Sequence, residues 1–155
     1  MYRRILVALD GSPSAQRALA EALKLAKLTG ATLEACYVVE RGKWPAAASP
    51  GFDAEPEPAD AKRAAADTAL AAARELLREA QVRGDVRTID AYAESVQAVL
   101  TRVADEIDAD LIVMGTHGRH GVGRFLVGSV AESLVRSTDK PVLIVRHDSS
   151  GPAPA

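Results

Sequence analysis

Short apolar runs that alternate with helix-forming stretches constrain the fold of this chain more than any other feature. Residues 5–9 (ILVAL), 111–114 (LIVM) and 141–145 (PVLIV) are continuous apolar runs. Continuous runs of this length are typical of parallel strands that are buried on both faces. The sequence also predicts strands at 32–39 and 85–91, and the second of these alternates apolar with polar residues.

Helix signals lie between the predicted strands. Ser12 can cap the first helix, Pro13 suits its first position, and Gly30 suits its end. We expect Gly84 to close a second, long helix that begins at about Ala59. The predicted helices cover 13–29, 59–83, 96–107 and 129–137. Strict alternation of strand and helix predicts an α/β fold with a parallel sheet, right-handed crossovers and helices on both faces.

Length and composition fit one globular domain. The chain has 155 residues, of which 48% are hydrophobic and 26% are charged, so it can bury a core without disulfide or metal support. We expect a single domain over 1–147. Residues 41–59 hold four of the eight prolines and show no hydrophobic period, which predicts a flexible loop that can act as a lid. Residues 148–155 are predicted to be a disordered tail.

Charge and cysteine content exclude several classes of protein. A net charge of -2 argues against a nucleic-acid binder, and the apolar runs are too short for a membrane span or a signal peptide. We therefore expect a cytoplasmic protein that binds neither nucleic acid nor membrane. Cys36 is the single cysteine, so the chain has no internal disulfide and no cysteine-based zinc site; we expect Cys36 to be buried.

A glycine-rich segment at 115–129 carries the strongest functional signal. It joins a predicted strand to a predicted helix, and glycine allows the backbone to approach a ligand closely. Backbone N–H groups in such a segment and at the helix start near Ser129 form an anion site. Arg119 and Arg124 add positive charge, so this combination favours a phosphate chain as ligand. The alternative is a flexible loop that only connects the two elements.

The familiar nucleotide motifs are absent. No G-x-x-x-x-G-K-[ST] sequence occurs, and neither the glycine-rich segment nor the turn after the first strand matches G-x-G-x-x-G. The sequence His117-Gly118-Arg119-His120 is only superficially similar to the paired histidines of nucleotidyltransferases, because its glycine is misplaced. Neither histidine has a carboxylate or cysteine at metal-ligand spacing. We predict no catalytic residue, and the sequence leaves a metal site open.

The spacing Gly115-x2-Gly118-x9-Gly128-Ser129 resembles the signature of the ATP-binding branch of the universal stress protein family. The segments 5–12, 37–39, 111–115 and 140–145 are also similar to that family, so the resemblance covers nearly the whole chain. It implies a Rossmann-like, five-stranded parallel sheet in the order 3-2-1-4-5. Ligands of such sheets bind beyond the carboxyl ends of the strands, where the strand order reverses.

The resemblance also implies the roles of individual residues. Asp10 would accept hydrogen bonds from ribose near the adenine end, although it can instead cap the first helix. Val38 would lie beside adenine, or simply in the core, and Met114 would pack on the nucleoside. Ala131 stands where the family often has a hydroxyl residue, so one phosphate or metal contact would be missing. The implied nucleotide-binding residues are Asp10, Val38, Met114, Gly115, Gly118, Arg119, Gly128, Ser129 and Val130.

Three functional hypotheses follow. The first is a regulatory stress-response protein that binds ATP, with or without Mg²⁺, and reports its bound state to a protein partner that the sequence does not name. The second is a slow ATPase or a phosphoryl or adenylyl transferase, although no general base is evident. The third is an interaction module whose cleft is empty or holds AMP. We also expect a homodimer through the last strand, Val142–Val145, because an apolar edge strand requires a partner or a cover.

Overall fold

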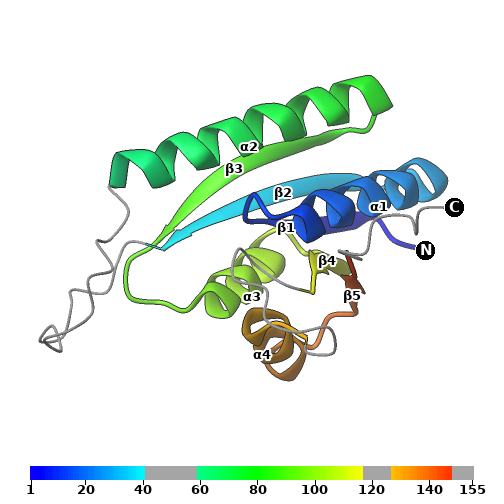
Figure 1. Ribbon diagram of the computed structural model, residues 1–155. Coiled ribbons are helices and arrows are strands. Elements are labelled where there is room, and N and C mark those ends of the chain that lie inside the picture. The colour runs from blue at the N-terminus through cyan, green and yellow to red at the C-terminus, as the bar shows by residue number, and fades with distance from the viewer. Residues whose placement is uncertain (41–58, 117–126, 148–155) are drawn as a thin grey trace, which may run out of the picture.

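The computed structural model describes residues 1–40, 59–116 and 127–147, which form alternating strands and helices (Figure 1). The five strands are all parallel and lie in the order β3-β2-β1-β4-β5. The predicted fold class and strand order are therefore confirmed. The elements are β1 (Arg4–Leu9), α1 (Pro13–Thr29), β2 (Thr32–Glu40), α2 (Ala59–Ala80), β3 (Gly84–Ala91), α3 (Val96–Glu106), β4 (Leu111–Gly115), α4 (Ser129–Ser137) and β5 (Val142–Val145).

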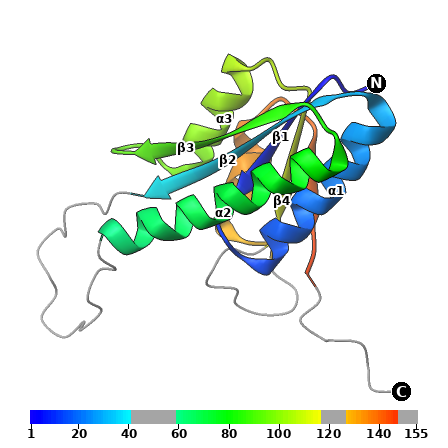
Figure 2. The same cartoon turned by 90° about the horizontal axis from the view of Figure 1, so that it is seen from above.

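Two helices cover each face of the sheet. Helices α1 and α2 lie on one face, and α3 and α4 lie on the other (Figure 2). The central strand β1 is buried by both layers, and Ile5, Leu6 and Val7 are fully inaccessible to solvent. Alternate residues of β1 belong to separate apolar clusters on the two faces, which explains the continuous apolar run in its sequence.

The predicted signals at both ends of α1 are confirmed. The Ser12 hydroxyl oxygen accepts a hydrogen bond from the Ala15 N–H at 3.2 Å, and Pro13 occupies the first helical position. Gly30 follows the helix in the left-handed region at φ 73°, where a side chain would be strained. These local signals place the start of α1 directly after β1.

The predicted end of the second helix is wrong. Helix α2 stops at Ala80 rather than at about Arg83, and Gln81 turns the chain at φ 55°. Gly84 does not cap the helix; it is the first residue of β3. A Cβ atom on Gly84 would lie 1.9 Å from the carbonyl oxygen of Leu33, so this glycine serves the close contact between β3 and β2.

Several predictions lie outside the described residues. These are the loop at 41–58 and the tail at 148–155; residue 59 belongs to α2. The single domain over 1–147 stays a prediction. Within the described part of the chain, no helix is both long and apolar enough to cross a membrane.

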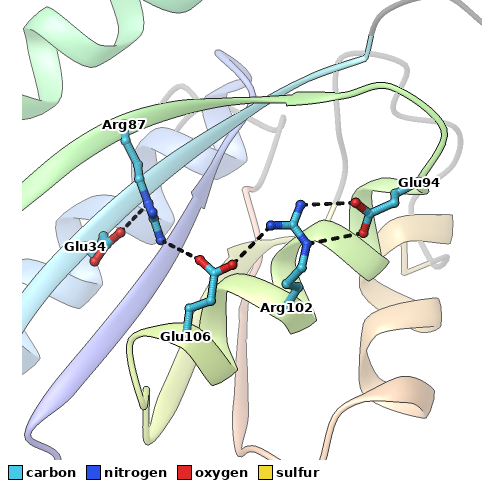
Figure 3. Close-up of polar contacts among 5 residues, drawn as sticks. All are labelled: Glu34, Arg87, Glu94, Arg102 and Glu106. Atoms are coloured by element: carbon cyan, nitrogen blue, oxygen red, sulfur yellow. Dashed lines mark hydrogen bonds and ion pairs between the residues drawn. The ribbon is translucent and has the colours of Figure 1, made fainter.

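A chain of ion pairs ties the edge strand β3 to its neighbours (Figure 3). Arg87 on β3 contacts Glu34 on β2, and its Nη2 atom lies 3.7 Å from Glu106 Oε2 on α3. Arg102 on α3 continues the chain, with Nη1 3.2 Å from Glu106 Oε1 and Nη2 3.1 Å from Glu94 Oε1. We call these five residues the ion chain; it connects β2, β3 and α3.

Cys36 lies beside the ion chain and is fully buried, as expected. Burial raises the pKa of its thiol to about 12, and the opposing positive charge of Arg87 does not offset that effect. A neutral thiol in an apolar environment is a poor nucleophile. Cys36 therefore acts as a small core residue in the folded protein.

We predict that Arg87→Gln lowers the free energy of unfolding by about 1–2 kcal/mol, because Glu34 loses its partner while it is largely shielded from water. The deficit should shrink in 1 M salt, which screens ion pairs. Urea unfolding monitored by circular dichroism measures both effects. Arg78→Gln is the control, because the Arg78–Glu75 pair on α2 is exposed; equal losses in the two variants would contradict the prediction.

We predict that the Cys36 thiol resists an aromatic disulfide reagent at pH 8 in the native protein and reacts rapidly in urea. Folding raises the pKa of this thiol from 9.0 to about 12, so the thiol contributes to the stability of the folded state at pH values below 9.0. This contribution is lost as the pH rises from 9.0 towards 12, because the unfolded chain then loses the thiol proton more readily. Absorbance of the released thiolate follows the reaction. Rapid stoichiometric labelling without urea would show that Cys36 is accessible in the native state.

Candidate functional site

The candidate site lies where β1 and β4 end side by side. These strands pair in parallel, with Val7 opposite Val113. The chain leaves β1 for α1 on one face and leaves β4 for α4 on the other. In open α/β sheets, ligands bind at the carboxyl edge between two strands whose following helices lie on opposite faces.

Asp10 follows β1 at this edge and is half-buried. Its Oδ1 atom accepts a hydrogen bond from the Ser12 N–H at 2.8 Å, in a turn that Gly11 completes at φ 79°. The Tyr37 hydroxyl of β2 donates to the Asp10 carbonyl at 3.2 Å. Asp10 Oδ2 makes no hydrogen bond or ion pair with the residues that the structure describes, so this oxygen is available to a ligand.

Gly115 ends β4 and lies directly against the start of α1. A Cβ atom on Gly115 would lie 2.3 Å from Ser14 Oγ and 2.7 Å from the Ser14 carbonyl carbon. Ser14 is buried, and its hydroxyl lies 3.3 Å from that of Ser12. The absence of a side chain at Gly115 therefore allows the first turn of α1 to approach β4.

Gly128 brings the chain back to the same edge. Its N–H donates to the carbonyl of Thr116, the residue that follows β4. Gly128 is the N-cap of α4 at φ -57°, a value that any residue can adopt, and no side chain of the described residues caps this helix. The free N–H groups at the start of α4 are thus positioned beyond the end of β4, where they suit an anion.

The other predicted site residues differ in accessibility. Ser129 is exposed and Val130 is half-buried at the start of α4. Val38 is half-buried and packs on the α3–α4 cluster, and Met114 is buried in that cluster. The Met114 side chain is therefore part of the core, and its predicted contact with a nucleoside stays a prediction. Gly118 and Arg119 lie outside the described residues.

The sequence reasoning missed three residues that build this edge: Ser14, Tyr37 and Thr116. Their roles depend on contacts between distant segments, such as Ser14 against Gly115. A small polar residue in the first turn of a helix has many uses, so no sequence signal identifies Ser14. For Tyr37 a sequence signal does exist, because a tyrosine hydroxyl at the end of a buried strand requires a hydrogen-bond partner.

A groove of about 360 Å³ runs between α1 and β5 and is lined by Arg17, Glu21 and residues 143–146. Its lining contains none of the predicted nucleotide-binding residues. Within 1–40, 59–116 and 127–147, no group of three or more His, Cys, Asp or Glu side chains is placed to hold a metal ion. The described edge therefore offers one carboxylate oxygen and a helix start, which together suit a ligand with hydroxyl groups and an anionic end.

We predict that Gly115→Ala destabilises the protein by about 1–3 kcal/mol, because the new methyl group overlaps Ser14. Ser14→Ala removes the nearest atom, so it should cost less in the Gly115→Ala background than in the wild type. Part of the loss should persist, since the Ser14 backbone also lies close. Urea unfolding of the wild type, the two single variants and the double variant gives a double-mutant cycle. If the two losses of stability simply add, the close contact is contradicted.

Comparison with known proteins agrees with this architecture. The family model of the universal stress protein family matches residues 1–146. A Staphylococcus aureus (strain USA300) relative that is named as a universal stress protein is 34% identical over 147 residues, which cover 95% of this chain and 86% of the relative.

Two solved structures extend the comparison. A protein of the universal stress protein family from Burkholderia pseudomallei has a TM-score of 0.72 and 39% identity, with 93% of this chain and 96% of that chain covered. The universal stress protein from Archaeoglobus fulgidus in complex with dAMP has a TM-score of 0.66 and 26% identity, with 93% and 98% covered. The family match, the identity to these relatives and the shared fold together establish that this chain belongs to the universal stress protein family.

Proposed function

We propose that this protein is a regulatory nucleotide-binding member of its family that binds ATP at the carboxyl edge of β1 and β4. The observation that carries the proposal is the convergence of Asp10 and Gly128 on that edge from opposite ends of the sequence. One supplies a carboxylate oxygen, and the other begins a helix with free N–H groups. A nucleotide presents the matching pair of groups, which are ribose hydroxyls and phosphates.

The two groups support one direction for the proposed nucleotide. Asp10 Oδ2 can accept a hydrogen bond from a ribose hydroxyl, whereas its negative charge repels phosphate. The start of α4 attracts phosphate through its N–H groups and the helix dipole. Ribose would therefore lie over the end of β1, with Val38 on the neighbouring β2 towards the base. The phosphates would extend over Gly115 to Gly128, Ser129 and Val130, with Gly118 and Arg119 as further predicted contacts.

The Archaeoglobus fulgidus relative in complex with dAMP supports a nucleotide as ligand. We propose ATP rather than a monophosphate because the glycine spacing resembles that of the ATP-binding branch. Mg²⁺ would then be held mainly by the phosphates, because the described residues offer no carboxylate cluster for it. We further propose a cytoplasmic location and a homodimer that pairs β5 strands, since Leu143 leaves an apolar side chain exposed on that edge strand.

Identification of the resident nucleotide tests this proposal most directly. The purified protein is denatured with acid, and the released nucleotides are separated and quantified. ATP at a substantial fraction of the protein concentration would support the proposal, whereas AMP would favour the interaction-module hypothesis. Calorimetric titration with ATP and AMP then compares their affinities. A single-turnover assay with labelled ATP decides between a binding protein, which leaves ATP intact, and the slow ATPase or transferase.

We predict that Asp10→Ala weakens ATP binding by about 1–3 kcal/mol, because a hydrogen bond from ribose to a carboxylate is lost. Asp10→Asn is the matched control, since its side-chain oxygen can still accept from the Ser12 N–H and keep the turn. Its amide offers donors where Oδ2 offered an acceptor, so this variant should also bind weakly. Calorimetry that finds normal affinity in Asp10→Asn would return Asp10 to a purely structural role.

We predict that Gly128→Val abolishes ATP binding and leaves the fold intact. A side chain at the N-cap of α4 would occupy the proposed phosphate position, whereas φ -57° causes no strain. Replacing glycine at an N-cap should cost only about 1 kcal/mol of stability. Calorimetry measures binding, and circular dichroism confirms folding. Gly121→Val is the control, because Gly121 is outside the family's spacing; ATP binding by a folded Gly128→Val variant would refute the phosphate site.

A further inference from the structure

The turn that presents Asp10 lies beyond the paired part of β1. Leu9 opposite Tyr37 is the last pair between β1 and β2, and Val7 opposite Val113 is the last pair between β1 and β4. Strand pairing therefore ends before Asp10. The orientation of the Asp10 carboxylate depends instead on the contacts of the turn itself.

The peptide group between Asp10 and Gly11 needs a contact that holds its orientation. Gly11 has φ 79°, and glycine adopts positive and negative φ about equally readily, so Gly11 does not by itself favour one orientation. The next N–H, that of Ser12, donates to Asp10 Oδ1 at 2.8 Å. Rotation about ψ of Asp10 or φ of Gly11 would move that N–H relative to the carboxylate.

The Tyr37 hydroxyl supplies such a contact, because it donates to the Asp10 carbonyl at 3.2 Å. Tyr37 is only 6% exposed, and its ring belongs to the apolar cluster that includes residues of α1 and α2. A ring packed in this way is already ordered before a ligand binds. It can therefore hold the turn without a further entropic cost on binding.

Tyr37 acts through Asp10 rather than on the ligand. Its ring is buried on the α1–α2 face of the sheet, whereas Val38, the next residue, packs on the α3–α4 face. The hydroxyl reaches the main chain of the same residue whose Oδ2 atom is available to a ligand. A change at Tyr37 is thus transmitted to the site by one hydrogen bond.

We propose that Tyr37 is a positioning residue that gives the site its preference for a nucleotide with ribose hydroxyls. Its hydroxyl holds the Asp10 carbonyl, and the Ser12 N–H holds Oδ1, so that Oδ2 is fixed where a ribose hydroxyl donates to it. This inference rests on the proposed ATP site. Without the Tyr37 hydroxyl, the turn samples further orientations and the ribose contact weakens, while the contacts with base and phosphates remain.

Calorimetric titration with ATP and with 2′,3′-dideoxy-ATP, which lacks both ribose hydroxyls, measures this preference. The wild type should bind ATP about fivefold or more tightly than the dideoxy nucleotide. Tyr37→Phe keeps the ring and removes the hydroxyl. It should weaken ATP binding about threefold or more and leave binding of the dideoxy nucleotide unchanged. A loss of folded protein would lower both affinities alike, so the ratio of the two affinities isolates the positioning role.

Two further variants control the experiment. Tyr2→Phe removes a hydroxyl from a ring that packs against the same apolar cluster, and it should change neither affinity. In the Asp10→Ala background, Tyr37→Phe should have no further effect on ATP affinity, because the carboxylate through which it acts is gone. Circular dichroism confirms that each variant is folded.

The outcomes separate the inference from the proposed function. A Tyr37→Phe variant that prefers ATP as strongly as the wild type, or losses that add in the Asp10→Ala background, would overturn the role of Tyr37 and leave the nucleotide site standing. A wild type that binds both nucleotides equally would overturn that role together with the contact between Asp10 and ribose. Absence of any ATP binding to the wild type would overturn the proposed function as well. Loss of the preference in Tyr37→Phe, beside an unchanged Tyr2→Phe variant, would support the inference.

Discussion

The parallel pairing of β1 with β4 is the contact on which the rest of the structure depends. It places at the centre of the sheet two strands whose following helices lie on opposite faces. Asp10 and Gly115 lie at the carboxyl edge of these strands although about a hundred residues separate them in the sequence. In open α/β sheets, an edge between two such strands is where ligands bind.

Glycine at the end of β4 shows how scaffold and site requirements overlap. Gly115 belongs to the spacing that resembles the family's ATP-binding branch, yet its contact with Ser14 explains a glycine there without any ligand. Evidence for a ligand therefore comes from elsewhere. It comes from Asp10 Oδ2 and from the start of α4, neither of which is hydrogen-bonded by a side chain of the described residues.

Much of this architecture could be predicted from the sequence because its signals are local. Continuous apolar runs marked the strands, and Ser12, Pro13 and Gly30 marked both ends of α1. The end of α2 was misplaced because Gly84 serves a contact with Leu33, and a glycine that relieves crowding between strands looks the same in sequence as one that ends a helix. The strand order came from the family resemblance, since periodicity alone does not order strands within a sheet.

The polar site residues were harder to predict for the same physical reason. Ser14 and Thr116 act through contacts with segments far away in the sequence, and Thr116 does so through its main chain, which its side chain does not reveal. Asp10 and Gly128 were named from the family resemblance, because a carboxylate after a strand and a glycine before a helix each have several uses, and their contacts with a ligand stay predictions.

The charged groups of the ion chain have partners of opposite charge, and this distinguishes them from the polar groups of the candidate site. The two arginines of the ion chain lie among three glutamates, and each of the five side chains has a partner of opposite charge. Those charges hold β3 against α3 and are not free to recognise a ligand. At the carboxyl edge, by contrast, one oxygen of Asp10 and the start of α4 have no side-chain partner among the described residues. Both are anchored on buried elements, because Leu9 precedes Asp10, and Ala131 and Leu134 hold the short helix in the core. A ligand that bridges them would meet groups already fixed in position, so little of its binding energy would be lost to ordering the protein.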